Sequence, residues 1–360
     1  MSKRLPYLGI LACCAVILAQ RLYTYHEPLE RDLTTYAVVG NELLHGKLLY
    51  SDAWDHKPPA IHAAYAVAIA VAGYGAGAVF LLNVSMAVAT LLGVYAAASQ
   101  AGAWRTGGLW AAAFWTIISA DLALQANQPN TEVFINACVV WAFAAILRLG
   151  RPPMKMAFVI VPGLLFALAT LFKPVVVGSA VALCLTYSAL TARGKRTRAS
   201  INVAVMAGVV VAAWAAVAGW FAITGRFDSF RDAVFTYNSF YAGSVADNLR
   251  RAFHSHNLFH KALLPIGIPL GCLIAIGFIR FRRVDPFFWA LLIAFLIAAN
   301  VQVALPGAFL PHYYQLMLPP LTIGAGVALA TWSRSNSRFP TVVGLLVFLS
   351  DLPARVWVSP

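Results

Sequence analysis

Apolar residues fill most of this chain in long runs, and short polar or charged segments separate the runs. A helix needs about 20 apolar residues to cross the hydrocarbon core of a bilayer, so the longer runs are membrane-spanning candidates. Twelve runs stand out, at about 6–22, 58–74, 76–98, 106–124, 131–148, 156–172, 174–192, 201–223, 261–279, 286–305, 313–332 and 339–352. The pattern predicts an all-α polytopic membrane protein.

Composition supports this class and excludes others. Hydrophobic residues make up 61% of the 360 residues, while Lys and Arg number 26 and Asp and Glu 13. Such a chain cannot build an ordinary water-soluble surface, which excludes a soluble enzyme. The net charge of +13 reflects topology rather than a nucleic-acid partner, because Lys and Arg accumulate in cytoplasmic loops. All five cysteines lie inside apolar runs with no CxxC pair, so we expect neither a disulfide framework nor a zinc site.

The placement of the basic clusters predicts the number of crossings. If all twelve runs crossed from an inside amino terminus, the clusters at 148–155, 193–198, 280–283 and 334–338 would lie outside. If the run 58–74 stays on the outer face, every cluster lies inside, as expected of cytoplasmic loops. The inner loops then hold 15 Lys and Arg and one acid, a net charge of +14. The outer side holds 11 Lys and Arg and 12 acids, a net charge of −1. We therefore predict eleven crossings plus an interfacial or re-entrant helix at 58–74, with the run 106–124 as the alternative non-crossing segment.

The outer side has two long loops, 23–57 and 224–260, within a single transmembrane domain that spans 1–360 without a soluble carboxy-terminal domain. The first loop holds six of the thirteen acids. Its apolar positions Leu33, Tyr36, Ala37, Gly40, Leu43 and Leu44 are spaced as in an amphipathic helix lying on the membrane. Asp32 stands at the start of this helix, where the dipole favours a carboxylate. Asp32 is therefore either a helix-end residue or part of a polar pocket at the bilayer surface.

The first outer loop also carries a recognisable motif. The run from Arg31-Asp32 through Tyr36, Leu44, Gly46, Tyr50, Asp52 and Trp54 to Lys57-Pro58-Pro59 resembles the first outer loop of GT-C glycosyltransferases. The likeness is to the bacterial branch similar to protein O-mannosyltransferases and lipid A aminoarabinose transferases. Shorter matches follow at 127–132 (NQPNTE), 171–174 (LFKP) and 311–314 (PHYY). The resemblance covers nearly the full chain.

This resemblance implies an activity. It implies transfer of a sugar, with inversion, from a polyprenyl-phosphate carrier to a lipid, glycan or protein acceptor on the outer face of a bacterial inner membrane. It makes Asp32 the general base that takes the proton of the acceptor hydroxyl. It makes Glu132 the second functional acid, although the family often has Asp there and Glu132 also fits a helix cap. We expect no cofactor, because this branch generally needs none, although some relatives use a divalent cation. Acceptor recognition would come from the outer loops or a partner protein.

The leaving phosphate would need cations or hydrogen-bond donors. Lys57, Lys173 and His312 with Tyr313 fall at predicted outer membrane ends. Arg250 or Arg251 is a further candidate, but adjacent helix positions do not share a face, so we expect at most one to bind. Tyr36 and Asp55 complete the predicted substrate-binding set. Snorkelling or interface residues are the ordinary alternative for these positions.

Other functions and sites fit the sequence less well. A transporter or flippase for lipid-linked glycans usually has charges within its helices or paired broken helices, whereas here the charges gather at one face. A non-catalytic relative that binds a lipid-linked glycan stays open, because Asp32 would look the same in it. A nucleotide-sugar enzyme is disfavoured, since no Gly-rich phosphate loop follows a strand. The triplet His254, His256 and His260 lacks the spacing and the carboxylate of a metal site, so we predict no metal.

Overall fold

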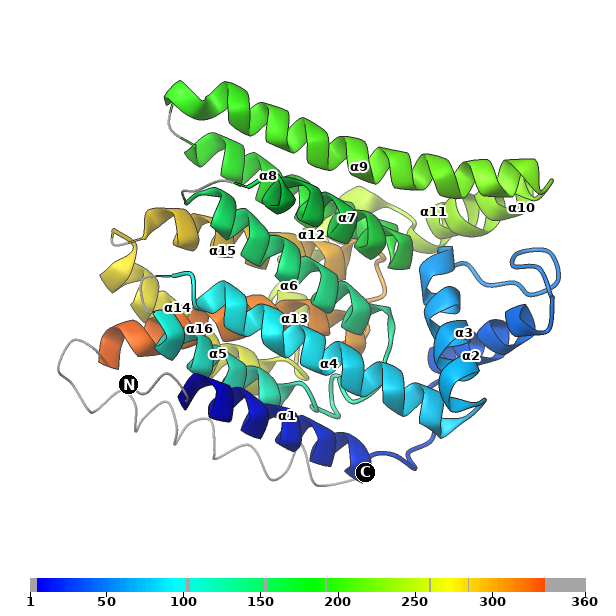
Figure 1. The fold of residues 1–360 in the computed structure, drawn as a ribbon, viewed down its shortest axis with the longest axis horizontal. Coiled ribbons are helices and arrows are strands. Elements are labelled where there is room, and N and C mark those ends of the chain that lie inside the picture. Colours follow the sequence, from blue (N-terminus) through cyan, green and yellow to red (C-terminus); the bar gives the residue numbers. More distant parts are fainter. Residues whose placement is uncertain are drawn as a thin grey trace.

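The computed structural model describes residues 5–333 apart from 102–103, 152–154, 192, 259 and 284, so the predicted run 339–352 lies outside the described residues. In this part of the chain the regular elements are helices, which confirms the predicted all-α class. The long helices run side by side as a bundle (Figure 1). They are α1 (Leu5–Tyr23), α4 (Ala76–Ala98), α5 (Trp104–Ile118), α6 (Thr131–Leu149), α7 (Ala157–Phe172), α8 (Val177–Leu190), α9 (Arg196–Ile223), α14 (Leu264–Phe281), α15 (Pro286–Ala304) and α16 (Leu318–Ser333).

The chain is an integral membrane protein. Seven described segments are long and apolar enough to cross a bilayer, namely those of α1, α4, α6, α9, α14 and α15 and the segment Pro311–Ser333. The apolar segments Ala157–Phe172 and Pro174–Leu190 are shorter. The count of eleven crossings therefore stays a prediction.

Shorter helices gather at one end of the bundle, which we call the acidic end. This end carries α2 (Arg31–Leu44), α3 (Pro59–Ala72), α10 (Phe227–Arg231) and α11 (Tyr237–Ala242) (Figure 1). A π-helical turn η3 (Asp232–Thr236) joins α10 to α11, and α12 (Val245–Ala252) and α13 (Ser255–Leu258) follow. The 3₁₀ turns are η1 (Pro174–Val176), η2 (Arg193–Lys195) and η4 (Pro311–Met317). The segments predicted as the two long outer loops meet here, since Asn238 donates a hydrogen bond of 2.7 Å to the carbonyl of His56.

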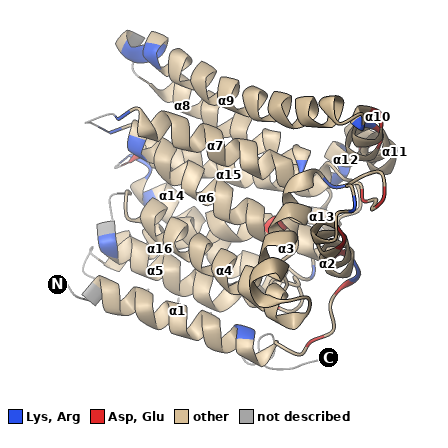
Figure 2. Ribbon diagram, turned by 45° about the vertical axis from the view of Figure 1, so that its right-hand side comes forward, with Lys and Arg blue, Asp and Glu red and all other residues tan. Residues whose placement is uncertain are grey.

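Charge is distributed unevenly between the two ends of the bundle. Figure 2 shows the positions of acidic residues concentrated around α2, α10 and α11, whereas the opposite ends of the long helices carry mainly Lys and Arg. Asp285 lies among those basic residues and pairs with Arg151 at 2.8 Å. This separation matches the asymmetry that the sequence predicts.

The structure corrects the surroundings of the first-loop helix. The sequence predicts that its apolar face lies on the membrane, but Leu33, Tyr36, Ala37 and Gly40 are buried in the protein. They pack against α3. Gly40 permits this close approach, because a Cβ there would lie 2.9 Å from the backbone nitrogen of Ala66. The face is therefore a helix–helix interface.

Helix boundaries also differ from the predicted runs in several places. The run 106–124 is helical only to Ile118 and continues as a buried loop, whereas α9 begins at Arg196, before its apolar run. Elsewhere the helices pack closely through small residues, as is usual in membranes. At Gly326, for example, a Cβ would overlap the backbone of Ala111 on α5. These contacts fix the frame that supports the acidic end.

Candidate functional site

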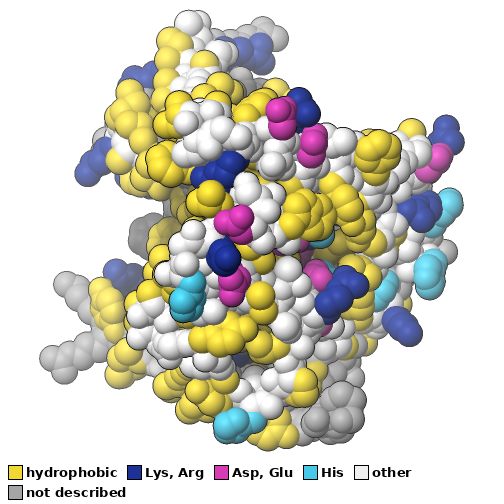
Figure 3. Space-filling view, turned by 90° about the vertical axis from the view of Figure 1, so that its right-hand side faces the viewer, with side chains coloured by type: hydrophobic (Ala, Val, Ile, Leu, Met, Phe, Trp, Pro, Cys, Tyr) yellow, Lys and Arg dark blue, Asp and Glu magenta, His cyan; other side chains and the backbone are white. Residues whose placement is uncertain are grey.

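Basic, acidic and histidine side chains lie among apolar ones on the acidic end, onto which Figure 3 looks. Beneath this surface, the structure brings together residues from four distant segments. We call them the polar cluster, which consists of Asp55, Lys57, Glu132, Lys173, His312 and Tyr313.

Glu132 and Lys173 form the buried centre of the polar cluster. Asn130 caps α6 by accepting a hydrogen bond from the backbone of Thr131, and this places Glu132 in the first turn. The Glu132 side chain is fully buried, and its Oε1 lies 2.8 Å from Lys173 Nζ. Its Oε2 accepts a hydrogen bond of 2.9 Å from the Thr131 hydroxyl. Both oxygens of Glu132 are therefore engaged within the protein.

Lys173 is held by its backbone as well as by Glu132. It ends α7 in an extended conformation, which a residue before proline favours, and Pro174 starts the next turn. Its Nζ lies 3.6 Å from the centroid of the Tyr313 ring, a cation–π contact. Lys173 is only 8% exposed, so the structure encloses it rather than leaving it to snorkel toward water.

His312 is buried beside Tyr313, with the two ring centroids 4.7 Å apart. Its Nδ1 lies 3.1 Å from Oε1 of Gln125. An amide oxygen only accepts hydrogen bonds, so we assign the proton to Nδ1. Gln125 has a φ of +53°, which is uncommon for a residue with a side chain. Gln315 donates to the carbonyls of Leu124 and Gln125, so η4 is locked to the loop 119–130.

Arg21 holds the same loop from the side of α1. It is 2% exposed and donates to Oδ1 of Asn83 at 2.9 Å and to the carbonyls of Ser119 and Ala126. Asn83 in turn donates to the carbonyl of Asn127. No carboxylate lies within 4 Å of Arg21 among the residues that the structure describes. Arg21 therefore acts as a buried anchor for loop carbonyls.

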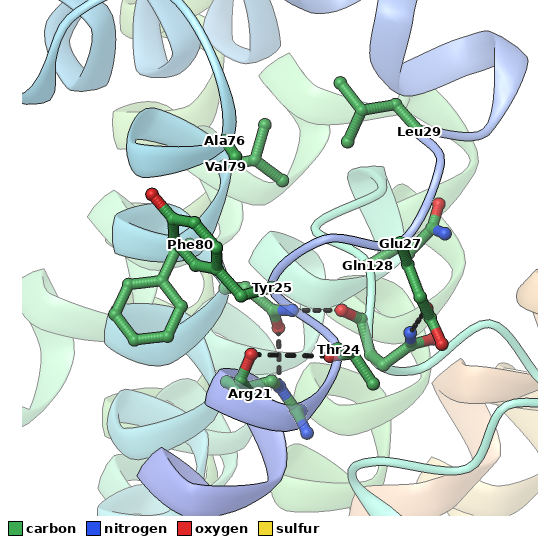
Figure 4. A pocket seen from close by; sticks show the side chains of 11 residues that line it. Arg21, Thr24, Tyr25, Glu27, Leu29, Ala76, Val79, Phe80 and Gln128 are labelled. Atoms are coloured by element: carbon green, nitrogen blue, oxygen red, sulfur yellow. Dashed lines mark hydrogen bonds between the residues drawn. The ribbon is translucent and has the colours of Figure 1, made fainter. Parts of the chain in front are cut away.

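A small cavity lies beside this anchor (Figure 4). The end of α1, the start of α4 and residues Asn127 and Gln128 line it, and its volume of about 30 Å³ suits about one water molecule. Asn127 donates to Glu27, and the backbone of Glu30 donates to Gln128 at 3.2 Å. The NQPN motif thus joins the first loop to the start of α6.

Asp55, His56 and Lys57 form a second chain of polar contacts. Oδ1 of Asp55 lies 3.1 Å from His56 Nδ1, and its Oδ2 lies 3.3 Å from His62 Nε2. Burial raises the pKa of Asp55, but the contacts with both histidines outweigh burial and hold it well below its usual value. His56 Nε2 lies 2.7 Å from Lys57 Nζ. Burial and then the nearby Lys173 ammonium lower the pKa of the half-buried Lys57.

Asp32 and Tyr36 border the polar cluster from α2. Asp32 lies in the first turn, pairs with the exposed Arg31 at 3.2 Å and keeps 22% of its side chain exposed. Its negative charge favours the protonated forms of Lys57 and Tyr36 and so acts to raise the pKa of each. Tyr36 is buried, and its hydroxyl lies 3.5 Å from Oδ1 of Asn130. Asp32 is therefore a partly accessible carboxylate at the edge of the cluster, whereas Tyr36 is packed inside.

The two arginine candidates are engaged elsewhere. Arg250 is exposed and pairs with Asp247 at 3.4 Å. Arg251 donates to Oδ1 of Asn248 at 2.8 Å and to the carbonyl of Gly307 at 2.6 Å. The structure thus places both outside the hydrogen bonds that it describes within the polar cluster.

Sequence reasoning missed three residues of this site. Arg21 is a single charge near the end of an apolar run, which resembles a snorkelling residue. His56 lies between the predicted residues Asp55 and Lys57, and this position is the signal that could have identified it. No sequence signal points to Gln125.

Comparisons with solved structures give the fold a context. No family model and no curated protein sequence matches the chain. ArnT from Cupriavidus metallidurans bound to undecaprenyl phosphate is similar in structure, with a TM-score of 0.68 and 19% identity over 96% of this chain and 63% of that one. A second similar structure is the archaeal oligosaccharyltransferase AglB from Archaeoglobus fulgidus in complex with an inhibitory peptide and a dolichol-phosphate. Its TM-score is 0.63, with 13% identity over 97% of this chain and 54% of that one.

The chain therefore spans between half and two thirds of the length of these neighbours. Both neighbours are GT-C glycosyltransferases. The predicted resemblance is confirmed at the level of the fold.

Proposed function

We propose that this protein is a glycosyltransferase that moves a sugar from a polyprenyl-phosphate carrier to an acceptor hydroxyl, with inversion, on the outer face of a bacterial inner membrane. One observation carries the proposal. Lys57, Lys173 and His312 come together with buried carboxylates at the acidic end of a bundle with a GT-C fold. The proposed orientation places this end outside, in line with the predicted charge asymmetry.

In this proposal, different residues act on the acceptor hydroxyl and on the leaving phosphate. The Asp32 carboxylate takes the proton of the acceptor hydroxyl while that oxygen attacks the anomeric carbon. The bond from this carbon to the phosphate oxygen breaks, and its electron pair stays on the phosphate. Lys57 and Lys173 stabilise the charge that develops there, and Tyr313 adds hydrogen-bond capacity. His312 supports Tyr313 by packing beside it and binding Gln125. Asp32 suits its role because it is the partly exposed carboxylate beside the cluster.

Glu132 has an indirect role in this proposal. Its carboxylate is fully buried and engaged by Lys173 and Thr131, which argues against direct contact with the acceptor. We propose that it holds Lys173 in place. Lys57, which is less buried, then meets the phosphate first. Asp55 and Tyr36 support the first loop from within, and the acceptor is a lipid, glycan or protein.

Asp32→Asn tests the proposed base. The full chain in liposomes would be supplied with a panel of radiolabelled polyprenyl-phosphate sugars and an envelope extract as acceptor. We expect transfer to slow by roughly 10²- to 10⁴-fold in this variant, with unchanged donor binding. Glu42→Gln, a carboxyl change near the other end of α2, is the matched control and should transfer normally.

Wild-type turnover in Asp32→Asn would exclude Asp32 as the base. Movement of labelled donor between leaflets by the wild-type protein, without sugar transfer, would favour the flippase alternative and contradict the proposal.

A further inference from the structure

His56 bridges a carboxylate and an ammonium that are its own chain neighbours. Its Nδ1 lies 3.1 Å from Oδ1 of Asp55, and its Nε2 lies 2.7 Å from Nζ of Lys57. An ammonium has three donors and no acceptor. Nε2 must therefore offer its lone pair to Lys57, and the ring proton must sit on Nδ1, where Asp55 accepts it. This arrangement requires a neutral imidazole.

The surroundings fix the ring of His56 in this orientation. Tyr237 and Tyr241 pack on it, with centroids 5.1 Å and 5.9 Å away. Asn238 holds the His56 carbonyl at 2.7 Å. On the other side, Asp55 also contacts the fully buried His62. The ring is thus clamped between the first loop and the segment of α11.

Neutrality of His56 matters because of the charges around it. Asp55 and Lys57 face the ring directly, and His62 lies behind Asp55. The positive charge of Lys173 lowers the pKa of Lys57. The facing residues of α11 are Tyr237, Asn238 and Tyr241, which carry no formal charge. A proton on Nε2 would point at the Lys57 ammonium, so the 2.7 Å contact would become a repulsion between two donors.

Resting on the proposed function, we propose that His56 is a positioning residue for Lys57. The neutral ring takes one of the three ammonium hydrogen bonds and aims the other two at the phosphate of the donor. A proton added to Nε2 would remove this acceptor and release Lys57, so acidification should weaken donor binding. Asp55 supports this arrangement by holding the proton on Nδ1.

Two substitutions separate the acceptor nitrogen from the packing of the ring. His56→Phe keeps the contacts with Tyr237 and Tyr241 but removes the acceptor. His56→Gln can place an amide oxygen near the Nε2 position and cannot titrate. Undecaprenyl phosphate would be bound to the full chain in nanodiscs at about pH 8 and about pH 5.5, with undecaprenol as the phosphate-free probe. His45→Gln, at the exposed end of α2, is the matched histidine control.

We expect His56→Phe to weaken binding roughly tenfold at the higher pH, because one charge-assisted bond no longer orients Lys57. His56→Gln should stay within about twofold of wild type there. At the lower pH it should lose less affinity than wild type or His45→Gln. Protonation of the phosphate and of the other histidines affects all three proteins alike, so the difference reports His56.

The outcomes distinguish this inference from the proposed function. Loss of affinity in Lys57→Ala, with wild-type binding in His56→Phe, would overturn the role of His56 and leave the function standing. Equal pH profiles for wild type and His56→Gln would also overturn it, even if His56→Phe did not fold. Wild-type binding in Lys57→Ala would instead contradict the proposed phosphate role of Lys57.

Discussion

Lys173 and Glu132 are 41 residues apart in the sequence, yet Nζ and Oε1 lie 2.8 Å apart in a buried ion pair. Burial of two charges has a large desolvation cost, so such a pair is stable mainly because each member compensates the other. The pair therefore joins α6 to the end of α7, and the loss of one member should be worse than the loss of both.

This pair gives a stability prediction. Glu132→Gln and Lys173→Met should each lower the free energy of unfolding by up to about 3–5 kcal/mol, and the double variant should recover part of that loss. Unfolding in a mild detergent titrated with a denaturing one would measure it. The Arg151–Asp285 pair is the control, because its side chains are 36% and 19% exposed and such pairs contribute about 0–1 kcal/mol. Additive losses in the double variant would contradict the compensation.

Donor binding should depend more strongly on Lys57 and Lys173 than on His312. Lys173→Ala and Lys57→Ala should each weaken binding of undecaprenyl phosphate by roughly ten- to a hundredfold, because each removes a charge-assisted contact. His312→Ala should do less, since the one proton of its neutral ring is already donated to Gln125. Equilibrium binding in nanodiscs would check this, with Lys261→Ala as the control. Unchanged binding in both lysine variants would show that neither holds the phosphate.

The predicted topology can be tested by labelling. In a background without native cysteines, Cys at Ser51 or Ser244 should react with a membrane-impermeant thiol reagent in intact cells. Cys at Thr197 should react only after permeabilisation. All three positions are exposed in the structure, so a lack of reaction would report the side of the membrane rather than burial. Labelling of Thr197 in intact cells would refute the model of eleven crossings.

The loop 119–130 should lose its order without Arg21. Arg21→Met removes the donor from two carbonyls and Asn83, and buried acceptors without partners cost about 1–3 kcal/mol each. Arg21→Lys should rescue only in part, because a single ammonium cannot match the planar fork of a guanidinium. Hydrogen exchange of the loop amides should rise in Arg21→Met and stay unchanged in Arg105→Met. Wild-type protection in Arg21→Met would exclude the anchor role.

The sequence predicted the elements of this structure better than their contacts. Apolar spacing located the helices, because burial in lipid or protein demands long apolar runs. It failed at 119–124, where the residues are apolar enough for a helix but Arg21 and the buried Asp121 bind the backbone instead. The distribution of Lys and Arg between inner and outer loops predicted that Lys57, Lys173 and His312 lie at one end of the bundle. The pairing of Lys173 with Glu132 could not be predicted, since it depends on how α6 and α7 pack.

The position of Arg21 has a consequence for biosynthesis. Its partners Asn83, Ser119 and Ala126 follow it by 62, 98 and 105 residues. At about 5–20 residues per second, the ribosome needs roughly 5 to 20 seconds to make the last of them. Until Asn83 is made, the guanidinium has none of its final acceptors, so it must stay near the lipid headgroups at the end of α1. The first helix therefore enters the membrane before it can take its final place, and its burial waits for the synthesis of α4 and α5.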